Sequence, residues 1–139
     1  MTALILPELV IEASTTFVIS SAIATRDFQD VHHDRDRAQQ RGSKDIFVNI
    51  LTTTGLVQRF VTDWAGPQAI VRNVAIRLGA PCYAGDTLTF TGQAEEVPAA
   101  AADGQGPAGP EYLVRVTGRC RLGDHVTGTV RVLIPGSPA

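Results

Sequence analysis

The feature that most constrains the fold of this chain is one long apolar segment at residues 46–64. Its apolar side chains recur at helical spacing, and other apolar residues lie off that stripe, so the segment is apolar on almost every side. A helix of this kind has to be buried over most of its surface. Ser43-Lys44-Asp45 supplies capping side chains before it, and Gly66-Pro67 ends it. The sequence therefore predicts a fold built around a single central helix.

The segments that flank this helix have strand patterns. Residues 15–23 are rich in β-branched side chains, and after the helix apolar residues recur at about every second position. We expect strands at residues 15–23, 69–78, 87–92, 112–122 and 126–134.

Turn signals complete the predicted topology. Gly123-Asp124 predicts a hairpin between the last two strands, and a short helical turn is expected at 35–40. Residues 94–110 are rich in Ala, Gly and Pro, which predicts a flexible loop at about 94–110. One buried helix followed by antiparallel strands predicts an α+β domain with the hot-dog fold, in which an antiparallel sheet wraps around one long central helix. We expect one such domain over residues 1–139.

The composition argues against several classes of protein. With 139 residues, of which 44% are hydrophobic, the chain can form a sizeable core. A net charge of -2 with no large basic patch argues against nucleic-acid binding. Neither a signal peptide nor a membrane-spanning apolar run is evident. Cys82 and Cys120 have neither metal spacing nor disulfide density, which favours a reducing compartment, so a cytoplasmic protein is expected.

The candidate chemistry lies in the polar loop between residues 27 and 38. Asp27 precedes His32 by five residues, so a bend in the loop would bring a carboxylate and an imidazole to one water molecule. Hydration of a double bond needs a base that deprotonates water and an acid that delivers a proton. The alternative is a solvated or turn-capping Asp with an unrelated His. Burial can reverse their basicities, so the sequence leaves open which of the two is the base.

This loop resembles the signature of the MaoC-like (R)-specific enoyl-CoA hydratases. The residues that match are Asp27, Val31, His32 and Ala38, and the segment 81–88 (PCYAGDTL) resembles a second motif of the superfamily. Two positions depart from the signature, since Arg26 stands where the family usually has Gly, and Gln29-Asp30 stands for Asn-Pro. Both catalytic groups of the family are retained.

A closer resemblance extends over most of the chain. Residues 24–34 (ATRDFQDVHHD) and several later runs resemble the small subunit of the heteromeric enoyl-CoA hydratases of actinobacterial steroid degradation. The resemblance implies that this subunit carries the catalytic dyad, that a larger MaoC-like subunit is its partner in an α2β2 heterotetramer, and that a steroid enoyl-CoA binds between them. The later runs are 42–51, 55–59, 63–67 and 123–127.

The resemblance also suggests an oxyanion donor. The family uses the backbone N–H of a Gly near the start of the helix, and the equivalent position here is Asn49, for which a side-chain role is also open. CoA would enter as part of the substrate, with no bound cofactor and no metal. We expect His33 at the surface and His125 in a turn. Alternatives are a hot-dog acyl-CoA thioesterase, a non-catalytic structural MaoC-like subunit, and a homodimer in place of the heteromer.

Overall fold

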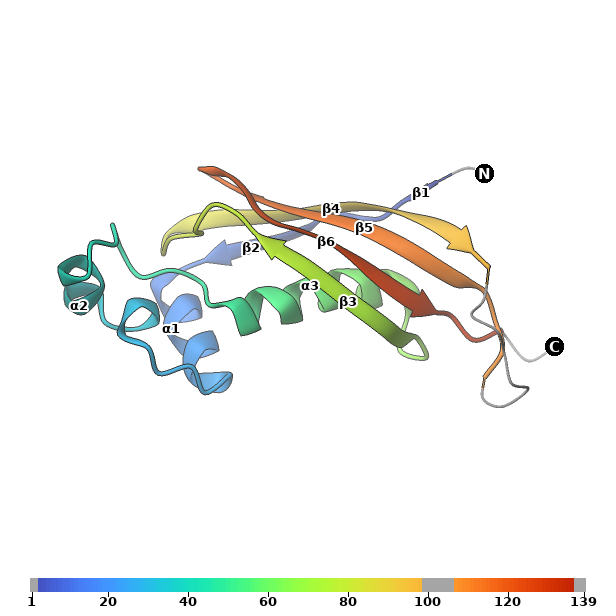
Figure 1. The fold of residues 1–139 in the computed structure, drawn as a ribbon, viewed down its shortest axis with the longest axis horizontal. Coiled ribbons are helices and arrows are strands. Elements are labelled where there is room, and N and C mark those ends of the chain that lie inside the picture. The colour runs from blue at the N-terminus through green and yellow to red at the C-terminus, as the bar shows by residue number, and fades with distance from the viewer. Residues whose placement is uncertain (1–2, 99–106, 137–139) are drawn as a thin grey trace.

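The computed structural model describes residues 3–98 and 107–136, and it forms one antiparallel sheet packed on a central helix (Figure 1). The strands follow the order β1-β4-β5-β6-β3, and β2 pairs with the same strand, β4, as β1 does. Helix α3 (Ile50–Ala65) runs along one face of the sheet, while α1 (Thr15–Ala24) and α2 (Arg35–Gln40) lie at one end. The strands are β1 (Leu4–Ile5), β2 (Leu9–Ala13), β3 (Ile70–Leu78), β4 (Asp86–Val97), β5 (Glu111–Cys120) and β6 (Gly123–Leu133).

The core lies between α3 and the sheet, which confirms the hot-dog architecture expected from the sequence. Phe60 of α3 packs against Phe90 of β4 with ring centroids 6.2 Å apart. Gly92 of β4 is required there, because a Cβ at this position would lie 2.8 Å from the Phe60 ring. The side chains of α3 that are buried in this core include Leu56, Val57, Phe60 and Val61.

Helix α3 begins at Ile50, four residues later than predicted. Residues 46–48 are extended and pair with the segment that precedes β4. Val48 N–H donates to Cys82 O at 3.0 Å, and Ala84 N–H donates to Ile46 O at 3.0 Å. The apolar character of these residues therefore reflects burial beside another extended segment, which periodicity alone does not distinguish from a helix.

The predicted strand at 15–23 is wrong, because these residues form α1. Ser14 caps the helix by accepting a hydrogen bond from Phe17 N–H at 3.1 Å. The two buried side chains of α1, Val18 and Ala22, are four residues apart and so face the core from one side of a helix. β-propensity is a weak preference that tertiary packing overrides. The first strands instead come from the N-terminal residues, for which no strand was predicted.

The other predicted elements are confirmed with shifts of a few residues, except at the predicted loop. Helix α2 and the hairpin at Gly123, where φ is +127°, lie as expected. Strand β4 continues to Val97, however, and the fully buried Ala94 pairs with Val114. The predicted loop is therefore shorter at its N-terminal side. Residues 99–106 lie outside the described residues, so their predicted flexibility stays a prediction.

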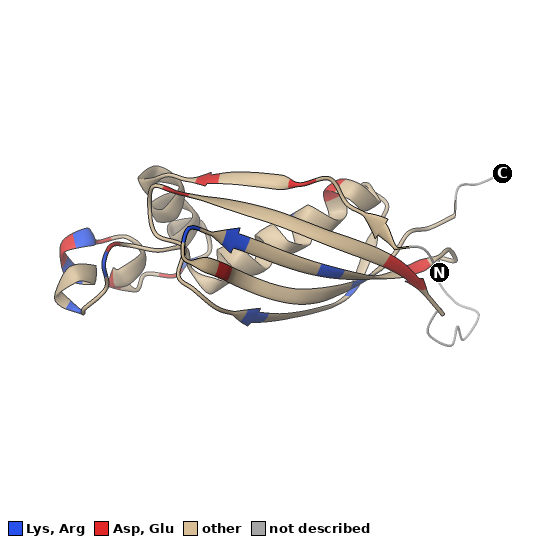
Figure 2. Cartoon of the chain, turned by 90° about the horizontal axis from the view of Figure 1, so that it is seen from above, with Lys and Arg blue, Asp and Glu red and all other residues tan. Residues whose placement is uncertain are grey.

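Charged residues of both signs lie on and around α2 (Figure 2). Asp30 lies 3.2 Å from the guanidinium of Arg41 and 4.0 Å from that of Arg37, and Arg35 pairs with Asp45 at 2.7 Å. These exposed pairs compensate one another and leave no strong excess of either sign near the dyad loop. Within the described residues, no helix combines the length and apolar character needed to cross a membrane.

Candidate active site

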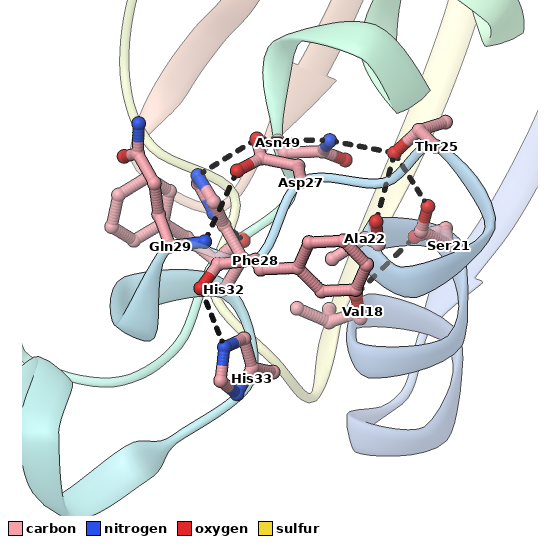
Figure 3. A network of polar contacts seen from close by, with 11 residues as sticks. Val18, Ser21, Ala22, Thr25, Asp27, Phe28, Gln29, His32, His33 and Asn49 are labelled. Carbon is pink, nitrogen blue, oxygen red and sulfur yellow. Dashed lines mark hydrogen bonds and ion pairs between the residues drawn. The ribbon is translucent and has the colours of Figure 1, made fainter.

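The end of α1 directs Asp27 toward the start of α3. Arg26 adopts a left-handed conformation with φ of +58°, which turns the chain sharply after the helix. The backbone N–H of Asp27 then donates to Ala22 O at 2.9 Å. This reversal brings the Asp27 carboxylate between His32 and Asn49 (Figure 3).

His32 is the imidazole that faces this carboxylate. It lies in the short 3-10 helix η1 (Asp30–His32) and is 7% exposed. Its Nδ1 lies 2.8 Å from Phe47 O, and because a carbonyl can only accept, Nδ1 carries the proton. In the neutral ring, Nε2 therefore has a free lone pair, and this atom lies 3.6 Å from Asp27 Oδ2. The Phe47 ring packs edge-on against the imidazole at 4.8 Å.

The separation of the dyad suits a shared water molecule. A distance of 3.6 Å exceeds that of a direct hydrogen bond, so Asp27 and His32 do not satisfy each other. Both atoms can still contact one water molecule that lies to the side of the line joining them. The structure thus brings together the two side chains that the sequence selected.

Asn49 is the N-cap of α3 and lies against the dyad. Its side chain is 1% exposed, and Nδ2 donates to Thr25 Oγ1 at 2.9 Å and to Asp27 Oδ2 at 3.2 Å. Within the described part of the chain, the backbone N–H of Asn49 makes no hydrogen bond. A free N–H at a helix N-terminus is suited to bind developing negative charge.

Sequence reasoning missed two contributors to this site. Thr25 holds the Asn49 amide, and the backbone carbonyl of Phe47 fixes the tautomer of His32. The first could have been suspected from the polar end of α1, which precedes Asp27 directly. The second has no sequence signal, because every residue carries a carbonyl and only the fold selects one.

Of the other two histidines, only one is not where the sequence placed it. His33 is partly exposed, and its Nε2 donates to Phe28 O at 2.9 Å, which stabilises the loop. The prediction of a turn residue is wrong for His125, which lies buried in β6 and bonds both Thr53 Oγ1 and Ala80 O at 2.8 Å. Burial lowers the pKa of His125, partly opposed by the bond to Ala80 O. The turn residues Gly123-Asp124 suggested a turn at His125, but its side chain faces the core.

The cysteines do not form a reactive centre. Burial, with smaller contributions from nearby Cys120 and Asp86, raises the pKa of the Cys82 thiol to about 12. A thiol with so high a pKa is a poor nucleophile at neutral pH. Cys120 is partly buried, and its Sγ donates to Pro81 O at 3.6 Å. Among the described residues, no three His, Cys, Asp or Glu side chains gather as metal ligands.

Comparison with known proteins places the chain in a family. No protein-family model matches the chain. The chain is 57% identical, over 92% of its length and 92% of the relative, to the 3-oxo-4,17-pregnadiene-20-carboxyl-CoA hydratase beta subunit of Mycobacterium tuberculosis (strain ATCC 25618 / H37Rv).

Solved structures agree in fold. A chain of the ChsH1-ChsH2 complex from Mycobacterium tuberculosis superposes with a TM-score of 0.83 at 54% identity, covering 96% of this chain and 98% of that one. An (R)-hydratase from A. caviae involved in PHA biosynthesis superposes with a TM-score of 0.78 at 18% identity, covering 97% of each chain, which is a likeness of fold alone. The chain belongs to the family of the steroid carboxyl-CoA hydratase beta subunit, and its fold is that of the MaoC-like hot-dog proteins.

Proposed function

We propose that this chain is the catalytic small subunit of a heteromeric enoyl-CoA hydratase that adds water to the α,β-double bond of a steroid side-chain enoyl-CoA. The observation that carries the proposal is the facing of His32 Nε2 and Asp27 Oδ2 at 3.6 Å beside the N-terminus of α3. The identity of 57% to a hydratase beta subunit supports the steroid carboxyl-CoA as the substrate class.

The tautomer of His32 suggests how the proton moves. Because Nδ1–H is committed to Phe47 O, neutral His32 offers the lone pair of Nε2 to a water molecule. His32 takes one proton from this water while the oxygen bonds to the β-carbon, and Asp27 stabilises the resulting imidazolium. His32 then returns the proton to the α-carbon. The product gains one hydroxyl and one hydrogen, and the dyad ends in its starting state.

The negative charge that forms on the thioester oxygen needs a donor. In this proposal the backbone N–H of Asn49 supplies it, aided by the partial positive charge of the α3 N-terminus. CoA enters as part of the substrate, so no bound cofactor is required. The CoA thioester and the unpaired thiols Cys82 and Cys120 support a cytoplasmic location.

The surface around the dyad supports a partner subunit. Exposed apolar side chains lie on the segments that carry the dyad and Asn49, which is a surface that a steroid and a second subunit would cover. A groove of about 270 Å³ beside the dyad loop is too small for a steroid CoA thioester, so further walls are needed. The apolar residues are Ile23, Phe28, Ile50 and Leu51, with exposed fractions from 45% to 64%.

The partner in the proposal is a larger MaoC-like chain, in an α2β2 heterotetramer. The likeness to a chain of the ChsH1-ChsH2 complex supports such a heteromer. This assembly is tested by measuring the mass in solution of this chain alone and of this chain co-expressed with a larger MaoC-like chain. Full activity of a homodimer on the steroid substrate, with no gain from the partner, would overturn the heteromeric assembly.

The activity is tested with the purified heteromer and a steroid enoyl-CoA. We expect hydration without release of free CoA, which separates a hydratase from a thioesterase. Asp27→Asn should abolish hydration while the complex still assembles. Asp30→Asn is the matched control, because this carboxylate lies in the same loop but pairs with Arg41 instead of the dyad. Near wild-type turnover of Asp27→Asn would leave the chain as a non-catalytic subunit.

A further inference from the structure

The side chain of Asn49 does not act as the cap of its own helix. Asn is common at the N-cap because its oxygen accepts a hydrogen bond from a backbone N–H of the first turn. No such bond forms at the start of α3. The carboxamide instead reaches back to the dyad loop, where Nδ2 contacts Thr25 and Asp27. The Asn49 side chain therefore binds residues of the candidate site and makes no capping hydrogen bond to its own helix.

The chemistry of its neighbours fixes which way the carboxamide points. Ionised Asp27 can only accept hydrogen bonds. Thr25 Oγ1 has one proton, which it donates to the end of α1, with Ser21 O at 2.7 Å and Ala22 O at 3.1 Å. Both contacts of Nδ2 are thus with acceptors, and a flipped amide would set Oδ1 against the same two acceptors.

This orientation leaves a buried acceptor without a partner. Within the described residues, Asn49 Oδ1 has no hydrogen bond, although it is inaccessible to solvent. A buried carbonyl oxygen in this state destabilises the folded protein. Such a group calls for a specific explanation, and a role at the neighbouring site is one. The amide thus has an unfavourable environment at one end and the catalytic carboxylate at the other.

The carboxylate of Asp27 needs this second contact. Its other oxygen, Oδ1, accepts a single hydrogen bond from Gln29 N–H, which is long at 3.3 Å. The contact with His32 at 3.6 Å is too long to hold the group in place. A carboxylate held at one oxygen can still rotate, whereas bonds to both oxygens fix its plane.

We propose that Asn49 is a positioning residue of the hydratase, whose Nδ2–H holds Asp27 Oδ2 toward His32 Nε2. This inference rests on the proposed function. It is separate from the oxyanion contact, because the backbone N–H would bind the thioester oxygen whatever side chain residue 49 carries.

The test is Asn49→Ala in the assembled heteromer. We expect kcat to fall about 100-fold, because small displacements of a catalytic group have effects of that size, with KM changed less than about threefold. The melting temperature should stay level or rise, because the orphan Oδ1 is gone.

Two further variants keep the result decisive. Asn49→Gly also removes the side chain but keeps a residue that is acceptable at an N-cap, so it serves if the Ala variant fails to fold. Thr52→Val is the matched control, since Thr52 is buried in the first turn of the same helix and its Oγ1 is likewise unpaired among the described residues. Its kcat and KM should match wild type.

The outcomes separate this inference from the proposed function. If Asp27→Asn loses hydration but Asn49→Ala and Asn49→Gly keep the wild-type kcat, the positioning role is wrong and the dyad stands. A loss of kcat that only follows a fall in melting temperature, or that comes with a rise in KM by the same factor, would also overturn it. If Asp27→Asn itself keeps full activity, the proposed function fails first.

Discussion

His32 and His125 are buried to a similar degree, yet their surroundings differ in one respect. His32 is 7% exposed and His125 is 4% exposed, and in both the Nδ1 atom lies 2.8 Å from a backbone carbonyl. The second nitrogen of His125 is bonded to the hydroxyl of Thr53 at 2.8 Å, whereas that of His32 faces the carboxylate of Asp27 at 3.6 Å. Both ring nitrogens of His125 therefore have hydrogen-bond partners, whereas Nε2 of His32 has none among the described residues.

This difference separates a structural histidine from one suited to catalysis. A proton on the ring of His125 would find no carboxylate within ion-pair distance among the described residues, and burial accordingly lowers its pKa. A proton on His32 would face Asp27 directly. Burial alone therefore does not identify a functional histidine, whereas an unsatisfied nitrogen opposite a charged group does.

The largest expected effect comes from His32→Ala. We expect kcat for steroid enoyl-CoA hydration by the heteromer to fall by about 10²–10⁴, the usual contribution of a general acid or base. The melting temperature should fall less than in His125→Ala, because His32 loses only the bond from Nδ1–H to Phe47 O and its packing on the Phe47 ring, whereas Nε2 has no direct hydrogen-bond partner to lose. Steady-state kinetics together with thermal unfolding check this. Retained kcat with a large loss of stability would show that His32 is structural like His125.

His125→Ala should have the opposite profile. Removing this ring leaves a cavity, and Thr53 Oγ1 and Ala80 O lose their hydrogen-bond partner. We therefore expect a loss of about 2–4 kcal/mol in the free energy of unfolding. The kcat of the molecules that remain folded should stay near wild type. Thr53→Val, which removes one of the two contacts and no volume, should have a smaller effect. A fall in kcat at unchanged stability would contradict the comparison.

The pH dependence of stability should also depend on His125. Its pKa in the folded protein is lowered from the usual value of 6.5, so below that pH the unfolded chain binds more protons than the folded one. Stability should therefore be fully present above about pH 6.5 and be lost as the pH falls through the window between 6.5 and the lowered value. Melting temperatures measured between about pH 5 and 8 check this. In His125→Gln this part of the slope should disappear.

The sequence predicted most of the sheet and the central helix because those elements depend on local periodicity. It predicted the wrong structure for residues 15–23, where β-branched side chains suggested a strand, but Ser14 and the burial of Val18 and Ala22 produce α1. It also missed β1 and β2, since β1 has two residues and β2 only five, too short for a clear pattern. Such strands are defined by their pairing with β4, which no local signal contains.

At the site, the sequence identified the groups but not their support. Asp27, His32 and Asn49 were selected in advance, and the structure brings all three together. Their catalytic roles stay predictions. The part that could not be predicted is the set of contacts between residues that lie far apart in the sequence. The tautomer of His32 depends on the carbonyl of Phe47, fifteen residues away, and the contact between Asn49 and Asp27 spans twenty-two residues.

The smallest expected effect concerns Arg26, which stands where the resembled hydratases usually have Gly. Its φ of +58° lies in the left-handed region, which costs a residue with a Cβ about 1–2 kcal/mol. Glycine avoids this strain but loses about 0.5–1 kcal/mol through its greater freedom in the unfolded chain. We therefore expect Arg26→Gly to stabilise the heteromer by about 0.5 kcal/mol, measured as a small rise in melting temperature. Arg26→Ala keeps the strain and should bring no gain. Equal destabilisation by Arg26→Gly and Arg26→Ala would contradict this expectation. It would show that the Arg26 side chain makes a stabilising contact that outweighs the backbone strain, so that the turn before Asp27 depends on this side chain as well as on the backbone conformation of residue 26.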